Sequence, residues 1–449
     1  MIRENDMNRF EYFAWFWLFL AMPDTTVTVF AADSVTPPFR CVRGHAYHIL
    51  PETHNMESGY FSLCEAHNDR IYVGTAKYGE NCYLVEFDPE TGKQRVVVDT
   101  NKICGLKPEG WYAAQAKIHT RNFVAPSGKI YLGTMGGYRK DGDDSEYPGG
   151  YVMVYDPKTE TGENLGIPYP GEGIMDIVAD EQRGLIYVIT DDLGAENNEH
   201  WVRYDASTKQ YSVFGPLLVT FGTTLVDSKG RANAITGDGR LAQYDPDSGK
   251  LTVRRLTVDG QEVAGPLRVP TWNLAADGRT AYLIQLTDPT LYAIDLLSEG
   301  EHVSAVSHGR MIEGRGYDSR CALSIGPDGS VYAVVRVDND TGFGRPDDYV
   351  HHLVRFDPQT KKMTDAGVLT VENPDFFYHS PGARQSGMIT GSQTNPSYYG
   401  FHKFSDGTMA VKLNHMAMIV ARDSTIYVTV LFPFTLLKIE PDAYRQAAK

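Results

Sequence analysis

Histidine, tyrosine and cationic side chains occupy matching places in several copies of a repeated segment, and these residue types suit proton transfer and anion binding. Counting back from the turn of each copy gives equivalent positions to Tyr60, His119, Arg320 and His415. Strand alternation places Gln115 and Lys117 on the same side as His119. Imidazole and phenol groups are common general bases and acids, and a nearby cation offsets a carboxylate. The pattern predicts a site that handles an anion.

Two loops are expected to open on the same face as these residues. The first carries Lys77 and Tyr78, and the second carries Tyr138, Arg139 and Lys140. We predict a catalytic group that consists of His119, His415, Arg320 and Tyr138. The predicted substrate-binding group consists of Lys117, Gln115, Tyr60, Lys77, Tyr78 and Arg139. The alternative is a channel lined by polar residues and water, in which His119 only ties neighbouring strands together.

The elements that must position these groups are short strands. In the clearest copy, residues 111–157, the turn Ser127-Gly128 separates two runs rich in β-branched and aromatic residues. A third run ends at Tyr155-Asp156-Pro157, because proline cannot donate a hydrogen bond to a ladder. The copy therefore predicts a small antiparallel meander.

The ending of that copy recurs along the chain. An apolar residue followed by Asp or Glu, and mostly by Pro, closes seven successive segments, at Phe87, Tyr155, Tyr204, Tyr244, Ile294, Phe356 and Ile439. A turn with a β-prone run precedes each ending, as at Asp328–Tyr332. Short strands repeated every ~40 to 80 residues are typical of propeller blades. The predicted fold is all-β, a seven-bladed β-propeller of four-stranded antiparallel blades over residues 59–441, with an insertion at 369–413.

The N-terminus has the pattern of an export signal. The apolar run Phe13–Met22 is too short to span a bilayer, and Val29–Ala32 offers a cleavage site of small residues. Acidic residues before the run, and Pro23 after it, depart from the usual pattern. We predict a signal peptide at 1–32, a secreted or periplasmic location, and no membrane insertion after signal removal. Residues 33–58 are then a closure segment, in which 46–50 is a candidate strand for the last blade, and 442–449 is a C-terminal tail.

Composition limits the partners. The 449 residues carry a net charge of −15, which argues against nucleic acid and anionic membranes because both require a basic surface. A polyanionic ligand needs a local basic patch, so we expect an acidic oligo- or polysaccharide as the partner of the predicted site. The chain is expected to be a monomer.

Metal and cofactor signals are weak. The five cysteines have no C-x-x-C spacing, although one or two disulfides could form in an oxidising compartment, and the histidines at 45, 48 and 54 fit no standard metal site. The acidic stretches 141–144 and 338–340 lack full EF-hand spacing, so solvated loops and a structural calcium ion remain the two interpretations. No other cofactor is predicted, and the sequence has no G-x-S-x-G, H-E-x-x-H or P-loop motif.

At the level of these repeats, residues 59–441 resemble seven-bladed propellers of the quinoprotein-like and YVTN-like kind, many of which are exported bacterial proteins. The resemblance implies fold more strongly than function. Secreted propellers include polysaccharide lyases in which His and Tyr serve as base and acid while a cation offsets the uronate carboxylate. This chain is similar to them in residue types. With only five Trp, it lacks the Trp-rich pattern of quinone-dependent propellers.

Three functions follow as hypotheses. The first is an exported carbohydrate-active protein, a polysaccharide lyase acting on uronic-acid-containing glycans by β-elimination. The second is a non-catalytic propeller that binds a glycan or a protein through the same face. The third is a metal-dependent lactonase-type hydrolase, which needs an axial set of carboxylates with Asn or His and for which Asn233 is a candidate.

Overall fold

The computed structural model describes most of the chain after residue 38. The described ranges are 39–55, 57–107, 110–192, 199–219, 221–263, 267, 270–312, 316–318, 322–343, 349–379, 400–431 and 433–445. The predicted signal peptide, Arg320, Cys321 and residues 380–399 of the expected insertion lie outside these ranges. No helix in the described ranges is long and apolar enough to cross a membrane.

The described chain is nearly all β, as predicted, and consecutive strands pair antiparallel into meanders. The first meander holds β2 (Glu57–Glu65), β3 (Ile71–Ala76), β4 (Tyr83–Phe87) and β5 (Gln94–Asp99). The second holds β6 (Lys117–Ile118), β7 (Phe123–Val124), β8 (Ile130–Met135), β9 (Val152–Asp156) and β10 (Thr161–Gly166). The third holds β11 (Gly173–Asp180), β12 (Leu185–Asp191), β13 (His200–Asp205) and β14 (Gln210–Val213).

The later meanders follow the same pattern. The fourth holds β15 (Leu225–Val226), β16 (Ala232–Ile235), β17 (Leu241–Asp245), β18 (Lys250–Val258) and β19 (Gln261–Glu262), and the fifth holds β20 (Pro270–Leu274), β21 (Thr280–Gln285), β22 (Asp288–Asp295) and β23 (His302–Arg310). The sixth holds β24 (Gly316–Asp318), β25 (Leu323–Ile325), β26 (Val331–Asp338), β27 (Tyr349–Asp357) and β28 (Lys362–Val371). The last holds β31 (Asn414–Val420), β32 (Ile426–Val430) and β33 (Thr435–Ile439).

Helices are short, and the expected insertion contains further strands. The helices are η1 (Pro51–Thr53), α1 (Thr100–Cys104), α2 (Phe376–His379) and α4 (Pro441–Arg445). In the insertion, β30 (Met409–Val411) pairs with both β28 and β29 (Phe401–Lys403), so its described part extends an existing sheet.

Side-chain hydrogen bonds explain why the repeated signatures end strands. Asp156, the last residue of β9, accepts the backbone N–H of Lys158 at 2.9 Å, and Asp357, the last residue of β27, accepts that of Gln359 at 2.9 Å. Such Asx turns stop a strand and start the next hairpin. At the preceding turns, Gly128 has φ of +89°, a conformation that glycine adopts without steric cost. The repeated Asp and Gly residues therefore set the lengths of the strands.

The N-terminal strand β1 (Cys41–His48) joins segments from both ends of the chain. Its residues 45–48 pair antiparallel with β33, and residues 41–44 pair parallel with β28. The strand expected at residues 46–50 overlaps β1, whose residues 45–48 pair with β33. The ladder between β1 and β33 begins at residue 45, one position before the expected strand. It makes β1 part of the sheet that contains β33.

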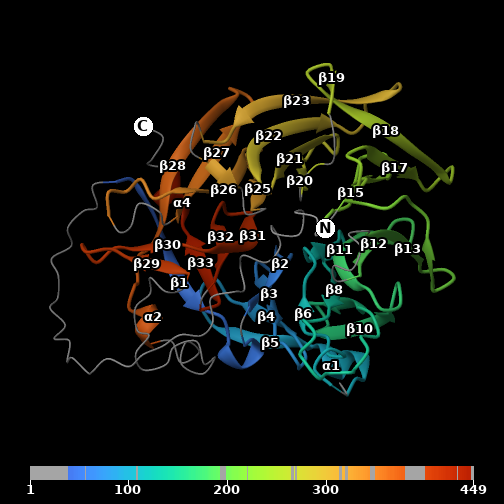
Figure 1. Cartoon of the computed structure of the whole chain (residues 1–449), viewed down its shortest axis with the longest axis horizontal. Coiled ribbons are helices and arrows are strands. Elements are labelled where there is room, and N and C mark those ends of the chain that lie inside the picture. Colours follow the sequence, from blue (N-terminus) through green and yellow to red (C-terminus); the bar gives the residue numbers. More distant parts are fainter. Residues whose placement is uncertain are drawn as a thin grey trace, which may run out of the picture. The chain divides into compact units, whose positions relative to one another are not determined.

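The first full strand of each meander faces a common centre (Figure 1). β2 packs beside both β7 and β31, β25 packs beside β20 and β31, and β11 packs beside β7 and β15. One central cavity is lined by residues of all of these strands. Meanders repeated around an axial cavity form the architecture of a β-propeller.

The core lies between neighbouring meanders. The tyrosines of the Ile-Tyr or Val-Tyr pairs in the second strands are buried, and Tyr72, Tyr187 and Tyr332 are at most 2% exposed. Tyr131 lies in β8 and Tyr332 in β26, as the repeat predicted. Each sheet thus buries both faces, which requires neighbours on both sides.

The N-terminal histidines and the cysteines are accounted for by packing. His45 contacts Glu372 at 2.7 Å, and burial lowers the pKa of His48 to about 3. Among the described residues, no cluster suited to a metal ion occurs. Cys41, Cys64, Cys82 and Cys104 are free thiols. The disulfides considered from composition are therefore not found among these four cysteines.

A buried imidazole clamps β27 to β28 and to the loop after β26. His352 is 4% exposed, its Nδ1 lies 2.9 Å from Asp365, and its Nε2 lies 3.5 Å from Asp340. Burial disfavours the charged imidazole, but the carboxylates of Asp340 and Asp365 outweigh burial and raise the pKa of His352 to about 9. The protonated side chain therefore stabilises the fold at neutral pH.

We predict that this clamp gives the fold a pH dependence in the alkaline range. Because the folded-state pKa is raised, the stabilisation is complete below the unfolded pKa of about 6.5 and is lost as pH rises through about 9. It should amount to about 2 to 3 kcal/mol. Urea unfolding of the wild type and of His352→Gln between these pH values measures the loss. The exposed-residue control His302→Gln should keep the wild-type slope, and an unchanged slope in His352→Gln would contradict the assignment.

Candidate functional site

One lysine, at the start of the first strand of the second meander (β6), is enclosed by three tyrosine rings. Nζ of Lys117 lies 4.6 Å from the ring centroid of Tyr60, 5.1 Å from that of Tyr138 and 5.6 Å from that of Tyr78. Lys117 is 4% exposed, whereas Tyr138 is 51% exposed. Ammonium groups are attracted to the faces of aromatic rings, more so when both are shielded from water. The cluster holds a buried cation directly beneath an exposed tyrosine.

Tyr60 reaches this cluster through a distorted backbone. Its φ is +59°, and the β2–β3 register is interrupted between Ser58 and Leu63. Its N–H is accepted by Oγ of Ser58 at 3.1 Å, and its hydroxyl lies 3.4 Å from that of Tyr138. A bulky residue with positive φ costs on the order of 1 to 3 kcal/mol, and such residues concentrate at functional sites. The bulge turns the phenol towards Lys117, where a regular strand would not place it.

Two further cations lie over aromatic rings next to this cluster. Nζ of Lys140 is 2.9 Å from the ring centroid of Trp111, and the guanidinium carbon of Arg139 is 4.2 Å from that of Tyr112. We call the combined surface the cation–aromatic platform, and it consists of Tyr60, Tyr78, Trp111, Tyr112, Lys117, Tyr138, Arg139 and Lys140. Alternating cations and ring faces suit a ligand that is both ring-shaped and anionic.

Backbone hydrogen bonds fix the loop that carries the platform. Oδ2 of Asp143 accepts the N–H of Tyr112 at 2.6 Å, and its Oδ1 accepts the N–H of Ser145 at 3.0 Å. Hydrogen bonds from Ser145 lower the pKa of Asp143, so its carboxylate stays charged and keeps the loop in place. Gly79 has φ of +78°, and a Cβ there would lie 2.0 Å from the Trp111 ring. This close approach requires glycine and seats Trp111 beside Tyr78.

The structure brings only part of the predicted site together. Tyr60, Tyr78, Lys117, His119 and Tyr138 meet, but His119 is 1% exposed and packs against the rings of Tyr60, Phe61 and Phe221. Its burial among rings does not suit a base that must meet a large substrate. Arg320 and the side chain of His415 lie outside the described residues.

The remaining predicted residues have structural partners. The Gln115 amide donates to the carbonyl of Gly149 at 2.9 Å and accepts from the Thr134 hydroxyl at 2.6 Å. Lys77 pairs with Glu80 at 2.9 Å, and Arg139 donates to two carbonyls of its own loop. Asn233, the lactonase candidate, is fully buried in β16, where its oxygen accepts from Gln243 at 2.7 Å. Of these four residues, only Arg139 belongs to the platform.

Arg121 is the residue that sequence reasoning missed. It follows His119 by two positions, and strand alternation alone could have placed both on the axial side. Its guanidinium binds both oxygens of Asp176, at 3.1 and 3.0 Å, and donates to the carbonyl of Trp272 at 2.8 Å. Burial raises the pKa of Asp176, although the Arg121 charge opposes this. The pair therefore joins three first-strand regions across the axis.

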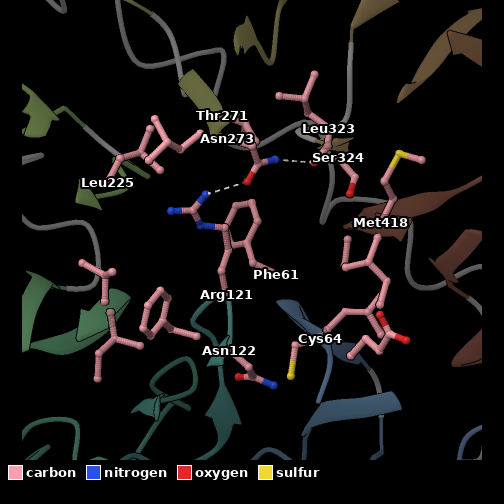
Figure 2. A pocket seen from close by; sticks show the side chains of 18 of the residues that line it. Phe61, Cys64, Arg121, Asn122, Leu225, Thr271, Asn273, Leu323, Ser324 and Met418 are labelled. Atoms are coloured by element: carbon pink, nitrogen blue, oxygen red, sulfur yellow. Dashed lines mark hydrogen bonds between the residues drawn. The ribbon is translucent and has the colours of Figure 1, made fainter. Parts of the chain in front are cut away.

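The Arg121 network is one wall of a central cavity of about 440 Å³ (Figure 2). Oδ1 of Asn273 accepts from Arg121 at 3.4 Å, and its amide donates to the carbonyl of Leu323 at 2.7 Å (Figure 2). The cavity also contacts Phe61, Leu63, Cys64 and Glu65 of β2. Tyr60 of the platform and Phe61 of the cavity wall are thus consecutive residues of the same strand.

The Arg121–Asp176 pair should be essential for stability. Arg121→Met leaves a fully buried carboxylate without its cation, which costs about 3 to 5 kcal/mol. Arg121→Met combined with Asp176→Asn should recover a large part of this loss, because the uncompensated charge is gone while an oxygen remains to accept the N–H of Thr224. Denaturant unfolding of both variants measures the difference. Equal destabilisation in the single and double variants would show that the charge pair is not the cause.

Solved structures similar to this chain have low sequence identity to it. A chain in the crystal structure of the mitotic checkpoint complex is 8% identical, with a TM-score of 0.51 over 94% of this chain and 99% of that chain. The extracellular domain of the putative hybrid two-component system BT3049 from B. thetaiotaomicron is 12% identical, with a TM-score of 0.49 over 90% of this chain and 42% of that chain. The WD40 repeats of RRP9 are 10% identical, with a TM-score of 0.47 over 91% of this chain and 99% of that chain.

No protein-family profile matches the sequence, and no curated protein matches it. At 8% identity, the likeness to the chain of the mitotic checkpoint complex concerns the fold alone.

Proposed function

We propose that this protein binds an acidic oligo- or polysaccharide on the cation–aromatic platform. The observation that carries the proposal is Tyr138, an exposed ring directly above the enclosed ammonium of Lys117. A flat ring face can stack on a sugar ring, and the exposed cation Lys140, two residues further along the same loop, favours a sugar that bears a carboxylate.

Charge on the platform supports an anionic ligand in a protein whose net charge is −15. In the described part of the chain, no carboxylate lies within ion-pair distance of Lys140, whose ammonium rests on the Trp111 ring. Arg139, by contrast, lies 3.8 Å from Glu146. Lys140 is therefore the platform cation most available to a ligand carboxylate.

The proposed function is accompanied by a seven-bladed ring and by export of the protein. The paired strands support a ring of seven four-stranded blades, in which β1 supplies the outer strand of the last blade. Export through residues 1–32 would place the platform where extracellular glycans occur. The cleavage of uronate glycans by β-elimination remains a separate proposal, because binding alone accounts for every platform contact.

Removal of the Tyr138 ring should weaken binding of uronate oligosaccharides. Truncation of an anchoring aromatic side chain commonly costs more than ~1 kcal/mol, so Tyr138→Ala should lower affinity at least about fivefold in calorimetric titration. Tyr138→Phe is the matched control: it keeps the ring and should bind nearly as the wild type does. Equal loss in both variants would mean that the hydroxyl, and not stacking, holds the ligand.

The charge contribution is separated with a second pair of variants. Lys140→Met should weaken binding and reduce its dependence on salt, because an exposed ion pair is screened by salt. Lys250→Met removes an equally exposed lysine from β18 and should change neither. If neutral oligosaccharides bind as tightly as acidic ones, the acidic-glycan assignment is wrong.

A further inference from the structure

A carboxylate–imidazole pair lies at the start of β13, apart from all the residues selected from the sequence. Nδ1 of His200 lies 2.9 Å from Oε1 and 3.0 Å from Oε2 of Glu172. Glu172 is 6% exposed, and its Oε2 also accepts the hydroxyl of Thr190 at 2.5 Å. The ring of Tyr169 stacks on the imidazole with centroids 4.5 Å apart and planes 11° from parallel. Glu172 and Tyr169 therefore fix the position and the plane of the His200 ring, and Thr190 holds Glu172 in place.

This arrangement determines which nitrogen can take a proton. A carboxylate only accepts hydrogen bonds, so the proton of a neutral His200 ring resides on Nδ1 and is donated to Glu172. Nε2 then presents its lone pair, and in the described part of the chain it has no hydrogen-bond partner. The side chain is 26% exposed, so a ligand can reach it. A carboxylate that orients an imidazole and stabilises its protonated form is how enzymes prepare a histidine base.

The pair adjoins the loop that carries the platform. The N–H of Gly150 donates to the carbonyl of Glu172 at 2.7 Å, and a Cβ on Gly149 would lie 2.9 Å from the carbonyl of Tyr169. A few residues earlier in the same loop, the ring of Tyr147 lies 6.0 Å from that of platform residue Tyr112. Glu172 and Tyr169, which hold His200, thus contact the loop that also carries Tyr138 and Arg139 of the platform.

We propose that His200 is the general base of a β-elimination on the acidic glycan that the platform binds, with Glu172 as its positioning residue. The proposal rests on the proposed function, because the platform must present the sugar. Nε2 takes the proton from the ring carbon next to the uronate carboxylate. The electron pair of that C–H bond forms a carbon–carbon double bond with the neighbouring ring carbon, and the bond from that carbon to the glycosidic oxygen breaks. The departing oxygen takes a proton from water.

His200 suits this step better than His119 does. The His119 ring is 1% exposed and enclosed by the aromatic side chains of Tyr60, Phe61 and Phe221. His200 is accessible and has the Glu172 carboxylate to stabilise its protonated form.

The test uses the full-length protein and uronate oligosaccharides, with binding followed by calorimetry and product by the absorbance of the new double bond. We expect turnover in the wild type and a loss of about a hundredfold or more in His200→Gln, because a side-chain amide cannot act as the base. Its affinity should stay near that of the wild type.

Glu172→Gln should lower turnover with little change in KM. Added imidazole should restore part of the turnover of His200→Ala, which a merely structural role does not predict. His302→Gln, an exposed histidine of β23, is the matched control.

The outcomes separate the two proposals. Binding without an unsaturated product from any uronate oligosaccharide overturns the elimination and leaves the binding function standing. Full turnover in His200→Gln overturns the assignment of the base alone. Absence of both binding and product overturns the proposed function and, with it, the elimination.

Discussion

The buried pair of Arg121 and Asp176 is the interaction on which the centre of the molecule depends. Asp176 is fully buried, and a charge in that position is tolerable only with a cation beside it. Because the same guanidinium also binds carbonyls near β15 and β20, it fixes the distance between strands that share no ladder. A ring of separate sheets needs such links, since apolar packing between sheets does not by itself set their angles.

Other axial hydrogen bonds continue from this pair in both directions. The Ser62 hydroxyl donates to Asn122 at 2.9 Å, and the Ser324 hydroxyl accepts the N–H of Val420 at 3.0 Å. Arg422 then reaches back to β2, where Glu65 accepts its N–H at 2.9 Å. These polar links line the central cavity, whose wall includes Arg121, Asn122 and Ser324. The platform differs from the cavity in its chemistry, because its cations lie over aromatic rings.

The sequence predicted the parts that depend on local chemistry. Asp156 and Gly128 act through their own turns, so each copy of the signature carries its structural meaning without its neighbours. Periodicity also placed Tyr60, Lys117 and Tyr138 in one region. It could not predict that Tyr60 leaves its strand through a positive φ, or that the rings bury His119, because both depend on packing between meanders.

Contacts between distant residues were beyond sequence reasoning for the same reason. Glu172 and His200 are 28 residues apart, and neither belongs to a recognisable motif. Arg121 and Asp176 are 55 residues apart, and only the ring places them face to face. Residues that act through such pairs resemble ordinary surface or core residues until the sheets are assembled.

The most direct test of the account is a crystal structure of the protein with a uronate oligosaccharide bound. The account predicts a sugar ring against the exposed face of Tyr138, with a carboxylate near Lys140. A sugar found instead in the central cavity would contradict this account. There the N–H groups of Arg121 already donate to Asp176 and to backbone carbonyls.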